Sequence, residues 1–298
     1  MRVQLTGFAL AFVSMVLMSC NYITAKIAMQ GFNPKAFAAL WYAAATILSL
    51  VLTFAMGQTK QLKIGGKELR LMLWLGLALT LVALLGWAGL SKMDPTFNAF
   101  LSRLTPMMTI LLGVVLLGEH VRPLEWLAVA VMVGGGVLST MGGTWKAEWW
   151  AILLTLAGCF FAALQFTLGK FGGDKSIPPL VMNVYRTAVA AVVITILTLA
   201  LGEFDLTQAQ PHHWAALLIG ALLGPCLSVT LTFASYRYWD MTRSAMVFTL
   251  QPLAVLPMAW VVFHNTPGGW KLVGGIVILV GGLWLVSLHR PPRDKAAN

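Results

Sequence analysis

Ten stretches of roughly 20 mostly apolar residues follow one another along this chain of 298 residues. A helix needs about that length to cross a hydrocarbon core some 30 Å thick. Hydrophobic residues make up 59% of the chain and charged residues only 10%, more apolar side chain than a soluble core uses. The sequence therefore predicts an all-α integral membrane protein with ten transmembrane helices, at residues 5–27, 35–57, 70–91, 96–118, 123–141, 148–169, 179–201, 213–236, 243–264 and 269–288.

The net charge of +10 comes mainly from basic residues between the apolar stretches. With a cytoplasmic N-terminus, the inside segments carry Arg2, Lys60, Lys63, Lys67, Arg70, Arg122, Lys170, Lys175, Arg237, Arg243, Arg290, Arg293 and Lys295. The outside segments carry only Lys26, Lys35, Lys92, Lys146 and Lys271. This asymmetry follows the positive-inside rule, so the charge needs no nucleic-acid partner. We expect a multi-pass protein of the inner (plasma) membrane with both termini in the cytoplasm.

The cysteines indicate neither a disulfide framework nor a metal site. Cys20, Cys159 and Cys226 all fall inside predicted spans, without ligand spacing. The segment that ends at Cys20 also resembles a lipoprotein signal, but its cleavage would remove the first span, for which the second half has a counterpart. We expect the span to be retained, and we expect no cofactor and no metal.

The two halves of the chain repeat each other. A shift of 144 residues pairs Asn21 with Gln165 and Lys26 with Lys170, and a shift of 146 pairs Asp94 with Asp240, Pro106 with Pro252 and the glycine pairs 135–136 with 281–282. The sequence therefore predicts two five-helix repeats, residues 1–142 and 143–298. An odd number of spans inverts the second repeat, as in secondary transporters with a cavity between the halves. The two extra residues lie near Gly224-Pro225 in span eight, where a local bulge can absorb them.

Polar residues form a stripe on span four and on span nine. Asn98, Ser102, Thr105 and Thr109 share one helical face, and the paired face of span nine carries Ser244, Phe248, Gln251 and Val255. Pro106 and Pro252 remove the helical partners of the carbonyls at Ser102 and Phe248, and we expect helix kinks there. The stripes are predicted to line a transport cavity. The alternative is that they bridge helices.

Further buried polar and charged residues extend this candidate site. Arg103 lies about eight residues into span four, and we interpret it as a cavity cation suited to a carboxylate rather than a snorkelling residue. Arg186, nearer a basic end, is interpreted as structural. Asn21 and Gln165 fit substrate contact and helix bridging equally well. The predicted substrate-binding residues are Asn21, Trp87, Asn98, Ser102, Arg103, Thr105, Gln165, Ser244, Phe248 and Gln251.

Several of these features resemble the EamA type of the drug/metabolite transporter superfamily over essentially the whole chain. They are the two halves, Leu104-Thr105-Pro106, Leu250-Gln251-Pro252, Gly118-Glu119 and the glycine runs at 134–136 and 281–282. In overall texture the chain is similar to aromatic amino-acid exporters of the YddG type. The resemblance implies a basket of helices around a cavity, with spans five and ten used for packing or for a homodimer. Two positions depart from the pattern. The second half has His264-Asn265 at the position of Glu119 in the first half, and the first half has Tyr42 at the position where the second half and many relatives carry arginine, here Arg186.

The predicted function is export of a small organic metabolite, most consistently an aromatic or other apolar amino acid, by alternating access. No nucleophile with a base, paired carboxylates or metal cluster lies at depth in a span, which argues against an enzyme. The absence of a carboxylate or histidine at depth also favours facilitated over proton-coupled transport. A multidrug exporter acting as a proton antiporter, a nucleotide-sugar or phosphate-type exchanger and a channel remain as alternatives.

Overall fold

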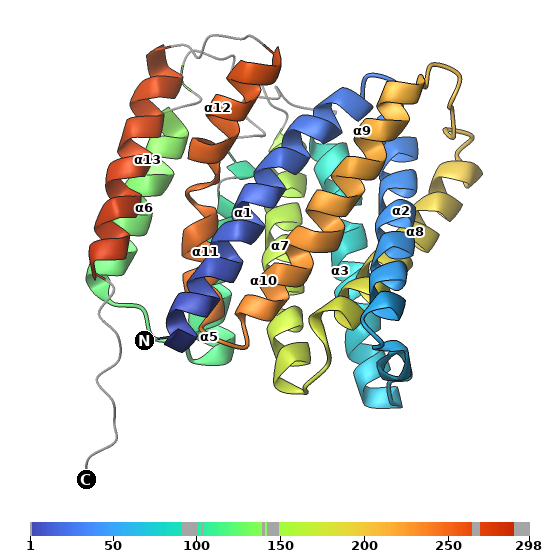
Figure 1. Cartoon of the computed structure of the whole chain (residues 1–298). Helices are drawn as coiled ribbons and strands as arrows, with labels where there is room; N and C mark the ends of the chain where they lie inside the picture. Colours follow the sequence, from blue (N-terminus) through green and yellow to red (C-terminus); the bar gives the residue numbers. More distant parts are fainter. Residues whose placement is uncertain are drawn as a thin grey trace.

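The computed structural model describes residues 2–90, 101–102, 104–138, 141, 149–263 and 269–288, which form helices and contain no strand. Figure 1 shows the helices standing side by side as one bundle. Its elements are α1 (Arg2–Ala28), α2 (Pro34–Ala55), the short helix η1 (Thr59–Leu62), α3 (Gly66–Leu90), α5 (Leu104–Leu117), α6 (Pro123–Leu138), α7 (Trp149–Asp174), α8 (Pro179–Ala200), α9 (Pro211–Ala221), the π-helix η2 (Leu222–Ser228), α10 (Val229–Ser235), α11 (Met241–Phe248), α12 (Gln251–Phe263) and α13 (Gly269–Leu288).

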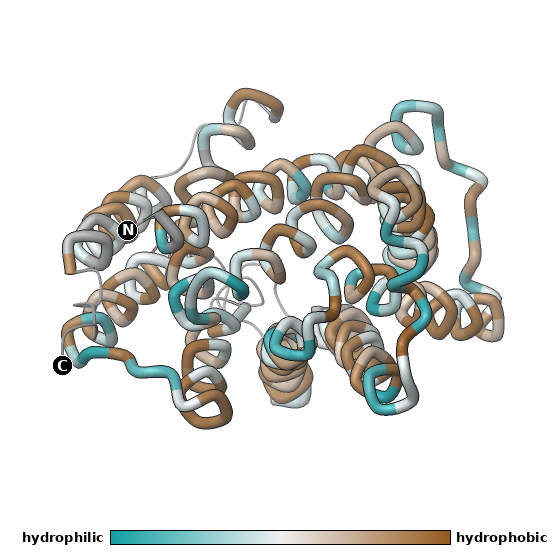
Figure 2. The backbone as a smooth tube through the Cα atoms, turned by 60° about the horizontal axis from the view of Figure 1, so that its bottom comes forward, coloured by the Kyte–Doolittle hydropathy of each residue, from teal (hydrophilic) through white to brown (hydrophobic). Residues whose placement is uncertain are grey.

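Each of the ten predicted spans coincides with helix in the part of the chain that is described. Seven helical segments there are long and apolar enough to cross a membrane, and shorter apolar helices occupy spans four, five and ten. Figure 2 shows that hydrophobic residues dominate the helices and hydrophilic ones the connecting loops. The all-helical fold class predicted from the apolar stretches is confirmed.

Span eight is interrupted by a π-helix instead of running as one α-helix. Gly224 and Pro225 lie inside η2, at the position where the second half has gained two residues. A wider turn accommodates extra residues without changing the direction of the helix. The predicted bulge is therefore confirmed, and its close approach to α1 explains the glycine, because a Cβ on Gly224 would lie 2.3 Å from Cγ of Asn21.

Span nine is broken beside Pro252. Helix α11 ends at Phe248 and α12 begins at Gln251, with a tight turn between them in which the Leu250 amide donates to the Val247 carbonyl over 3.1 Å. Proline has no amide hydrogen for the Phe248 carbonyl, so the helix cannot continue regularly. The kink predicted in span nine is confirmed. In span four, Pro106 lies in the first turn of α5, where helices tolerate proline, and Arg103 before that helix lies outside the described residues.

Each of the main contacts between two helices has a counterpart between the equivalent helices of the other half. Helix α1 packs on α9, η2 and α10, and its repeat counterpart α7 packs on α3. Likewise α5 contacts α7 while α11 and α12 contact α1, and α2, α5 and α6 contact their own counterparts α8, α11 and α13. A two-fold relation between the halves requires such a pattern. It supports the inverted repeat predicted from the odd number of spans.

The glycine runs of spans five and ten bring α6 and α13 into close contact. A Cβ on Gly135 would lie 2.8 Å from the Gly274 carbonyl oxygen, and one on Gly281 would lie 2.6 Å from Cγ of Met132. Small residues let membrane helices approach in this way. The glycines therefore serve packing within the chain, and the predicted homodimer through these spans stays a prediction.

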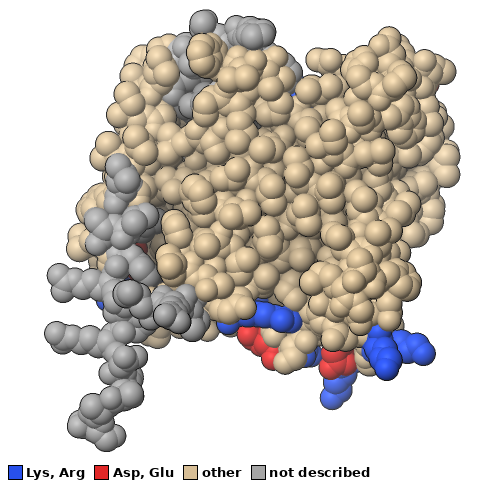
Figure 3. All heavy atoms as spheres, viewed as in Figure 1, with Lys and Arg blue, Asp and Glu red and all other residues tan. Residues whose placement is uncertain are grey.

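Charged side chains gather at one end of the bundle. On the face shown in Figure 3, Lys, Arg, Asp and Glu lie mostly along the lower edge. Helix α1 begins and α13 ends at this same end, which we call the basic end (Figure 1). With the positive-inside rule, this end is the expected cytoplasmic face.

We expect reporters inserted near Gly65 and fused after Asn298 to read cytoplasmic, and one inserted near Asp205 to read external, because the first two lie in basic segments. Paired phosphatase and fluorescent-protein fusions in intact cells measure this. A C-terminal reporter on the outside contradicts the inverted ten-span topology.

Candidate functional site

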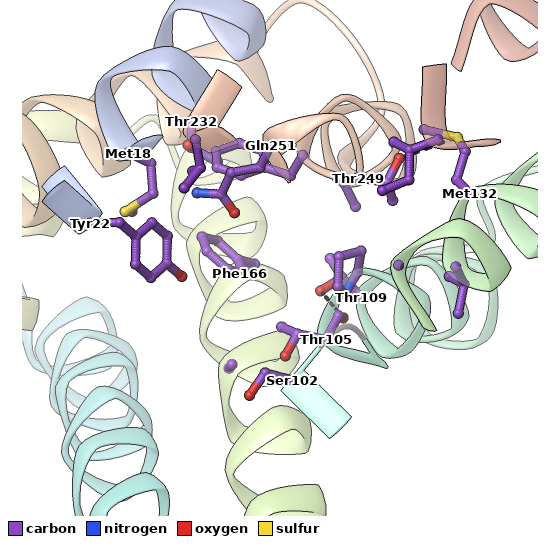
Figure 4. Close-up of a pocket in the computed structure, with 18 of the residues that line it drawn as sticks. Met18, Tyr22, Ser102, Thr105, Thr109, Met132, Phe166, Thr232, Thr249 and Gln251 are labelled. Carbon is purple, nitrogen blue, oxygen red and sulfur yellow. Dashed lines mark hydrogen bonds between the residues drawn. The ribbon is translucent and has the colours of Figure 1, made fainter. Parts of the chain in front are cut away.

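A cavity of about 560 Å³ lies within the bundle, between helices of both halves. The first half contributes α1, α3, the helical residue Ser102, α5 and α6, and the second contributes α7 and α10 to α13. The lining residues are Met18, Tyr22, Val82, Ser102, Thr105, Pro106, Thr109, Met132, Val133, Gly136, Ala162, Phe166, Thr232, Tyr236, Ala245, Phe248, Thr249, Gln251, Val255 and Ile278. Figure 4 shows their side chains converging from several helices.

The stripes of spans four and nine meet at this cavity. Ser102, Thr105 and Thr109 line it from span four, and Gln251 lines it from span nine (Figure 4). Phe248 also lines it from span nine. The Thr109 hydroxyl donates to the Thr105 carbonyl oxygen over 2.9 Å, a bond that Thr often makes within a helix. The wall therefore offers hydroxyl and amide groups along two facing elements.

Gln251 carries an unpartnered donor on this wall. Its Nε2 is buried and has no hydrogen-bond partner among the residues that the structure describes. Leaving a buried polar group unsatisfied costs about 1–3 kcal/mol. The break between α11 and α12 places Gln251 at the start of a helix, where the side chain reaches the space between α1 and α7 (Figure 4). Bound cargo or water at this point relieves that cost.

Aromatic and sulfur-containing side chains form much of the rest of the wall. Tyr22 and Phe166 face the cavity from α1 and α7, and Met18 lies beside Tyr22 (Figure 4). Tyr22 is 55% exposed in spite of its place in a predicted membrane span. The sequence prediction does not include these residues. An aromatic or Met residue on an apolar helix carries no polar signal, although the position of Phe166 next to Gln165 could have drawn attention to it.

Three predicted binding residues lie away from the cavity wall. Ser244 is 1% exposed, accepts a hydrogen bond from Trp239 Nε1 over 2.6 Å and shares another with the Ser235 hydroxyl over 2.8 Å. Asn21 packs on Gly224 of η2, and Gln165 accepts from Arg186 Nε over 3.0 Å. The bonds of Ser244 and Gln165 fit helix bridging, the alternative given for such residues above, whereas Asn21 contacts η2 by packing and donates to Met18 Sδ of its own helix over 3.6 Å.

The remaining predicted residues are only partly visible. Asn98 and Arg103 lie outside the described residues. Trp87 belongs to α3 and Pro252 to α12, but their side chains are not among those that the structure describes. Contact of Asn98, Arg103 and Trp87 with substrate stays a prediction.

A buried polar network surrounds Arg186 in α8. Arg186 is 4% exposed and donates to Gln165 Oε1 over 3.0 Å and to Asn183 Oδ1 over 2.8 Å. The Asn183 amide group in turn donates to the carbonyl oxygens of Pro225 over 2.7 Å and Cys226 over 3.3 Å. The network joins α7 and α8 to the π-helix, which agrees with the structural role predicted for Arg186.

Glu119 joins the two halves at the basic end. Its Oε1 accepts from the Met241 amide over 2.7 Å, and its Oε2 accepts from the Thr242 amide over 2.7 Å and from the Thr242 hydroxyl. These amides belong to the first turn of α11, where helix N–H groups have no partner within the helix and the dipole favours a carboxylate. Gly118 allows the approach through its positive φ of 66°. The sequence analysis noted the Gly118-Glu119 motif, but it did not predict the contact of Glu119 with the start of α11.

A bundle of apolar helices with a cavity between its two halves, and helices broken beside that cavity, has the architecture of a secondary membrane transporter. The chain belongs to the EamA-like transporter family, whose model matches it twice, at residues 5–141 and 149–288. The two matches lie on either side of the predicted junction at 142–143.

One relative agrees with this family, and one solved structure shares the fold. An uncharacterized transporter of Synechocystis sp. is 23% identical over 223 residues, 71% of this chain. The match spans 64% of that relative, less than two thirds of its length. A crystal structure described only as that of a protein has a TM-score of 0.80 with this chain at 16% identity, covering 96% of this chain and 97% of the other, and it shows the fold alone.

We expect Thr105→Cys to react with a small polar thiol reagent at least about tenfold faster than Ser244→Cys, because thiol reactivity depends on access and Thr105 lines the cavity while Ser244 is buried. The measurement uses folded protein in detergent from which Cys20, Cys159 and Cys226 have been removed, with gel filtration as the control for folding. Equal rates at the two positions contradict the described cavity.

Proposed function

We propose that the protein is a secondary transporter that exports small organic metabolites, above all aromatic or other apolar amino acids, by alternating access. The observation that carries the proposal is the cavity of about 560 Å³ whose wall combines hydroxyl and amide groups with aromatic rings. This volume falls within the usual range for small-molecule sites. Membership of the family indicates a transporter, and the residues of the cavity wall suggest which cargo it carries.

The wall fits the two ends of such an amino acid. Ser102, Thr105 and Gln251 offer neutral donors and acceptors to the polar end, while Phe166 and Phe248 offer rings to an apolar or aromatic side chain (Figure 4). The ammonium group can also lie against an aromatic face. A cavity of this kind accepts several side chains of similar size, because its aromatic part is not specific in shape.

Arg103 is proposed to bind the carboxylate. Its neighbours Ser102 and Thr105 line the cavity, while Arg103 itself lies outside the described residues. A guanidinium group binds a carboxylate through two parallel hydrogen bonds, which a lysine cannot reproduce. One such cation matches one carboxylate.

The alternative cargoes fit this wall less well. A nucleotide sugar or sugar phosphate calls for several cations, and no Lys or Arg is among the lining residues within the described chain. A multidrug exporter remains the second candidate, because aromatic rings and the flexible side chains of Met18 and Met132 accept varied apolar molecules. Competition of neutral, cationic and zwitterionic compounds for one labelled amino acid separates the two.

We further propose a cytoplasmic location for the basic end and a homodimer through the outer faces of α6 and α13. Leu124 and Leu127 of α6 and Ile276 and Val280 of α13 expose large apolar side chains. The glycines of these helices already pack against each other within the chain, so the outer faces are the ones left for a partner.

We expect purified protein in liposomes to take up labelled phenylalanine or tryptophan, and Arg103→Ala to lower kcat/KM about 10- to 100-fold, which corresponds to one charge-assisted hydrogen bond. Arg103→Lys is expected to lose transport as well, while both variants still fold. Arg70→Ala removes the same charge at the exposed start of α3 and is the matched control. Full activity of Arg103→Ala assigns Arg103 to snorkelling, and no uptake of any amino acid by the wild type contradicts the proposed cargo.

Energy coupling is proposed to be facilitated, driven by the gradient of the cargo itself. The described lining residues include no Asp, Glu or His. The Glu119 carboxylate, at the basic end, is engaged by three donors of α11. A carrier driven by protons needs a group inside the membrane whose protonation changes with access.

With phenylalanine at equal concentration on both sides of the liposome membrane, we expect an imposed pH gradient to cause no net accumulation. The membrane potential is clamped with potassium and valinomycin, and exchange of labelled for unlabelled cargo is the positive control. Accumulation that a protonophore abolishes shows proton coupling and refutes the facilitated mechanism.

A further inference from the structure

A second, polar cavity of about 410 Å³ lies near the basic end. It is formed by the end of α7, the connection from α7 to α8 and the residues that follow α10. Its lining residues are Lys170, Gly173, Asp174, Ser176, Tyr236 and Arg237. Two of these are cations and one is an anion, so the cavity carries one net positive charge.

Both cations keep donors beyond the bonds they make within the chain. Lys170 Nζ donates to the Tyr236 carbonyl oxygen over 2.6 Å, and Arg237 Nη2 donates to the Ile177 carbonyl oxygen over 2.9 Å. An ammonium group has three donors and a guanidinium group five. Asp174 is 3.8 Å from Lys170 and its side chain is 57% exposed, so this ion pair is weak and screened by solvent.

These two bonds also have a simpler explanation, because cations often bind the free carbonyl groups at helix C-termini. That role explains the two bonds to carbonyl groups. It does not explain why an open cavity is left between the two side chains.

The loop residue Ser176 is held in a conformation that non-glycine residues rarely adopt. Its φ is 61°, the only positive value for a non-glycine residue in the described chain. The conformation belongs to the C-terminal cap of α7, in which the Ser176 amide donates to the Gly173 carbonyl oxygen over 2.9 Å and the Ile177 amide to the Gly172 carbonyl oxygen over 3.1 Å. This cap places Ser176 on the cavity wall, and a Cβ on Gly173 would meet no atom within 4 Å.

Tyr236 connects this cavity with the central one, because it lines both. It is 4% exposed and packs against Phe233, with ring centroids 6.1 Å apart. Lys170 holds its carbonyl group. Tyr236 therefore belongs to the walls of both cavities, with Lys170 and Arg237 on the side of the basic end.

We propose that the polar cavity is an entry site at the basic end, at which Lys170, Arg237 and the Ser176 hydroxyl bind the carboxylate of the cargo before it passes Tyr236. The proposal rests on the proposed function, since it requires a cargo with a carboxylate. An anionic lipid headgroup shares this chemistry and is the competing occupant. Both tests below use liposomes of phosphatidylcholine alone, which contain no anionic headgroup.

The first test measures the attraction of anions without transport. Ser176→Cys is made in a chain without its native cysteines and is treated with thiol reagents that carry a sulfonate or a trimethylammonium group. For this variant we expect the ratio of the sulfonate to the trimethylammonium reaction rate to be about fivefold higher than for a free thiol, as one nearby unpaired charge predicts. Lys170→Gln and Arg237→Gln abolish this preference, while Lys175→Gln, in the same connection but outside the cavity, largely keeps it. A ratio like that of the free thiol overturns the site.

The second test measures transport from the basic end. We expect Arg237→Gln and Lys170→Gln to raise the half-saturating concentration of phenylalanine about five- to tenfold, and to leave that of neutral-ended phenylalaninamide unchanged, because only the acid carries the carboxylate. Lys175→Gln is the control for surface charge. Equal effects on the acid and the amide, or equal effects of all three variants, overturn the entry site.

The two tests separate failure of this inference from failure of the proposed function. Absence of phenylalanine transport in the wild type counts against the amino-acid cargo, while the reagent ratio at position 176 still decides whether the cavity attracts anions. If the sulfonate preference is present but the entry kinetics of the acid do not change, the site does not serve the cargo and the inference is wrong. A phenylalanine half-saturation that shifts only after phosphatidylglycerol is added assigns the cavity to lipid and equally overturns it.

Discussion

Every backbone N–H and C=O group inside a bilayer must find a partner within the protein, and the broken helices of this structure depend on how that requirement is met. The π-helix η2 contains Pro225 and leaves carbonyl groups that a regular helix would bind. Asn183 donates to the carbonyl oxygens of Pro225 and Cys226 in this helix, the second of which also accepts from the Val229 amide, and Arg186 holds Asn183 in place. At α11 the Glu119 carboxylate accepts the first amides of the helix. Irregular backbone therefore occurs where another helix supplies its partner.

The two halves meet this requirement differently, although they share one architecture. The residues that correspond to Gln165, Asn183 and Arg186 in the first half are Asn21, Ala39 and Tyr42. The network around the guanidinium group therefore exists in the second half, and Asn21 Oδ1 is left buried without a hydrogen-bond partner. The first half lacks this network, and its helix α3 is regular, with no bulge at the position that corresponds to η2. The extra residues of span eight and the buried arginine are thus parts of one arrangement.

The helices, the bulge, the break at Pro252 and the cavity-facing stripes could be predicted because each has a local signal. Apolar length, proline and polar residues three or four positions apart act within one helix. The fate of a buried polar side chain depends on other helices. Ser244 belongs to the same stripe as Gln251, yet Trp239 and Ser235 occupy its hydroxyl group, whereas Gln251 Nε2 has no partner. Nothing in the spacing of a single stripe distinguishes these two cases.

Phe248 was predicted, but three other aromatic residues of the cavity wall were not, for a related reason. Tyr22, Phe166 and Tyr236 stand in apolar segments in which an aromatic residue is equally suited to lipid, core or cavity. Their place in the wall follows from the packing of α1 on span eight and of α7 on α3, contacts between residues far apart in the sequence. Such contacts become visible only when the helices are assembled.

The repeat also indicates that the two ends of the cavity are not held equally. Lys170 has a lysine counterpart in Lys26, but Glu119 corresponds to Asn265. A carboxylate accepts from several donors at once and binds them more strongly than a neutral amide oxygen does. At the basic end, one carboxylate binds two amides and a hydroxyl group of α11 and so fastens the end of span four to the start of span nine, the two spans that carry the stripes. An amide at the opposite end cannot make an equivalent set of charge-assisted bonds. If access alternates by rocking of the two repeats, the basic end opens only when these charge-assisted bonds of Glu119 break.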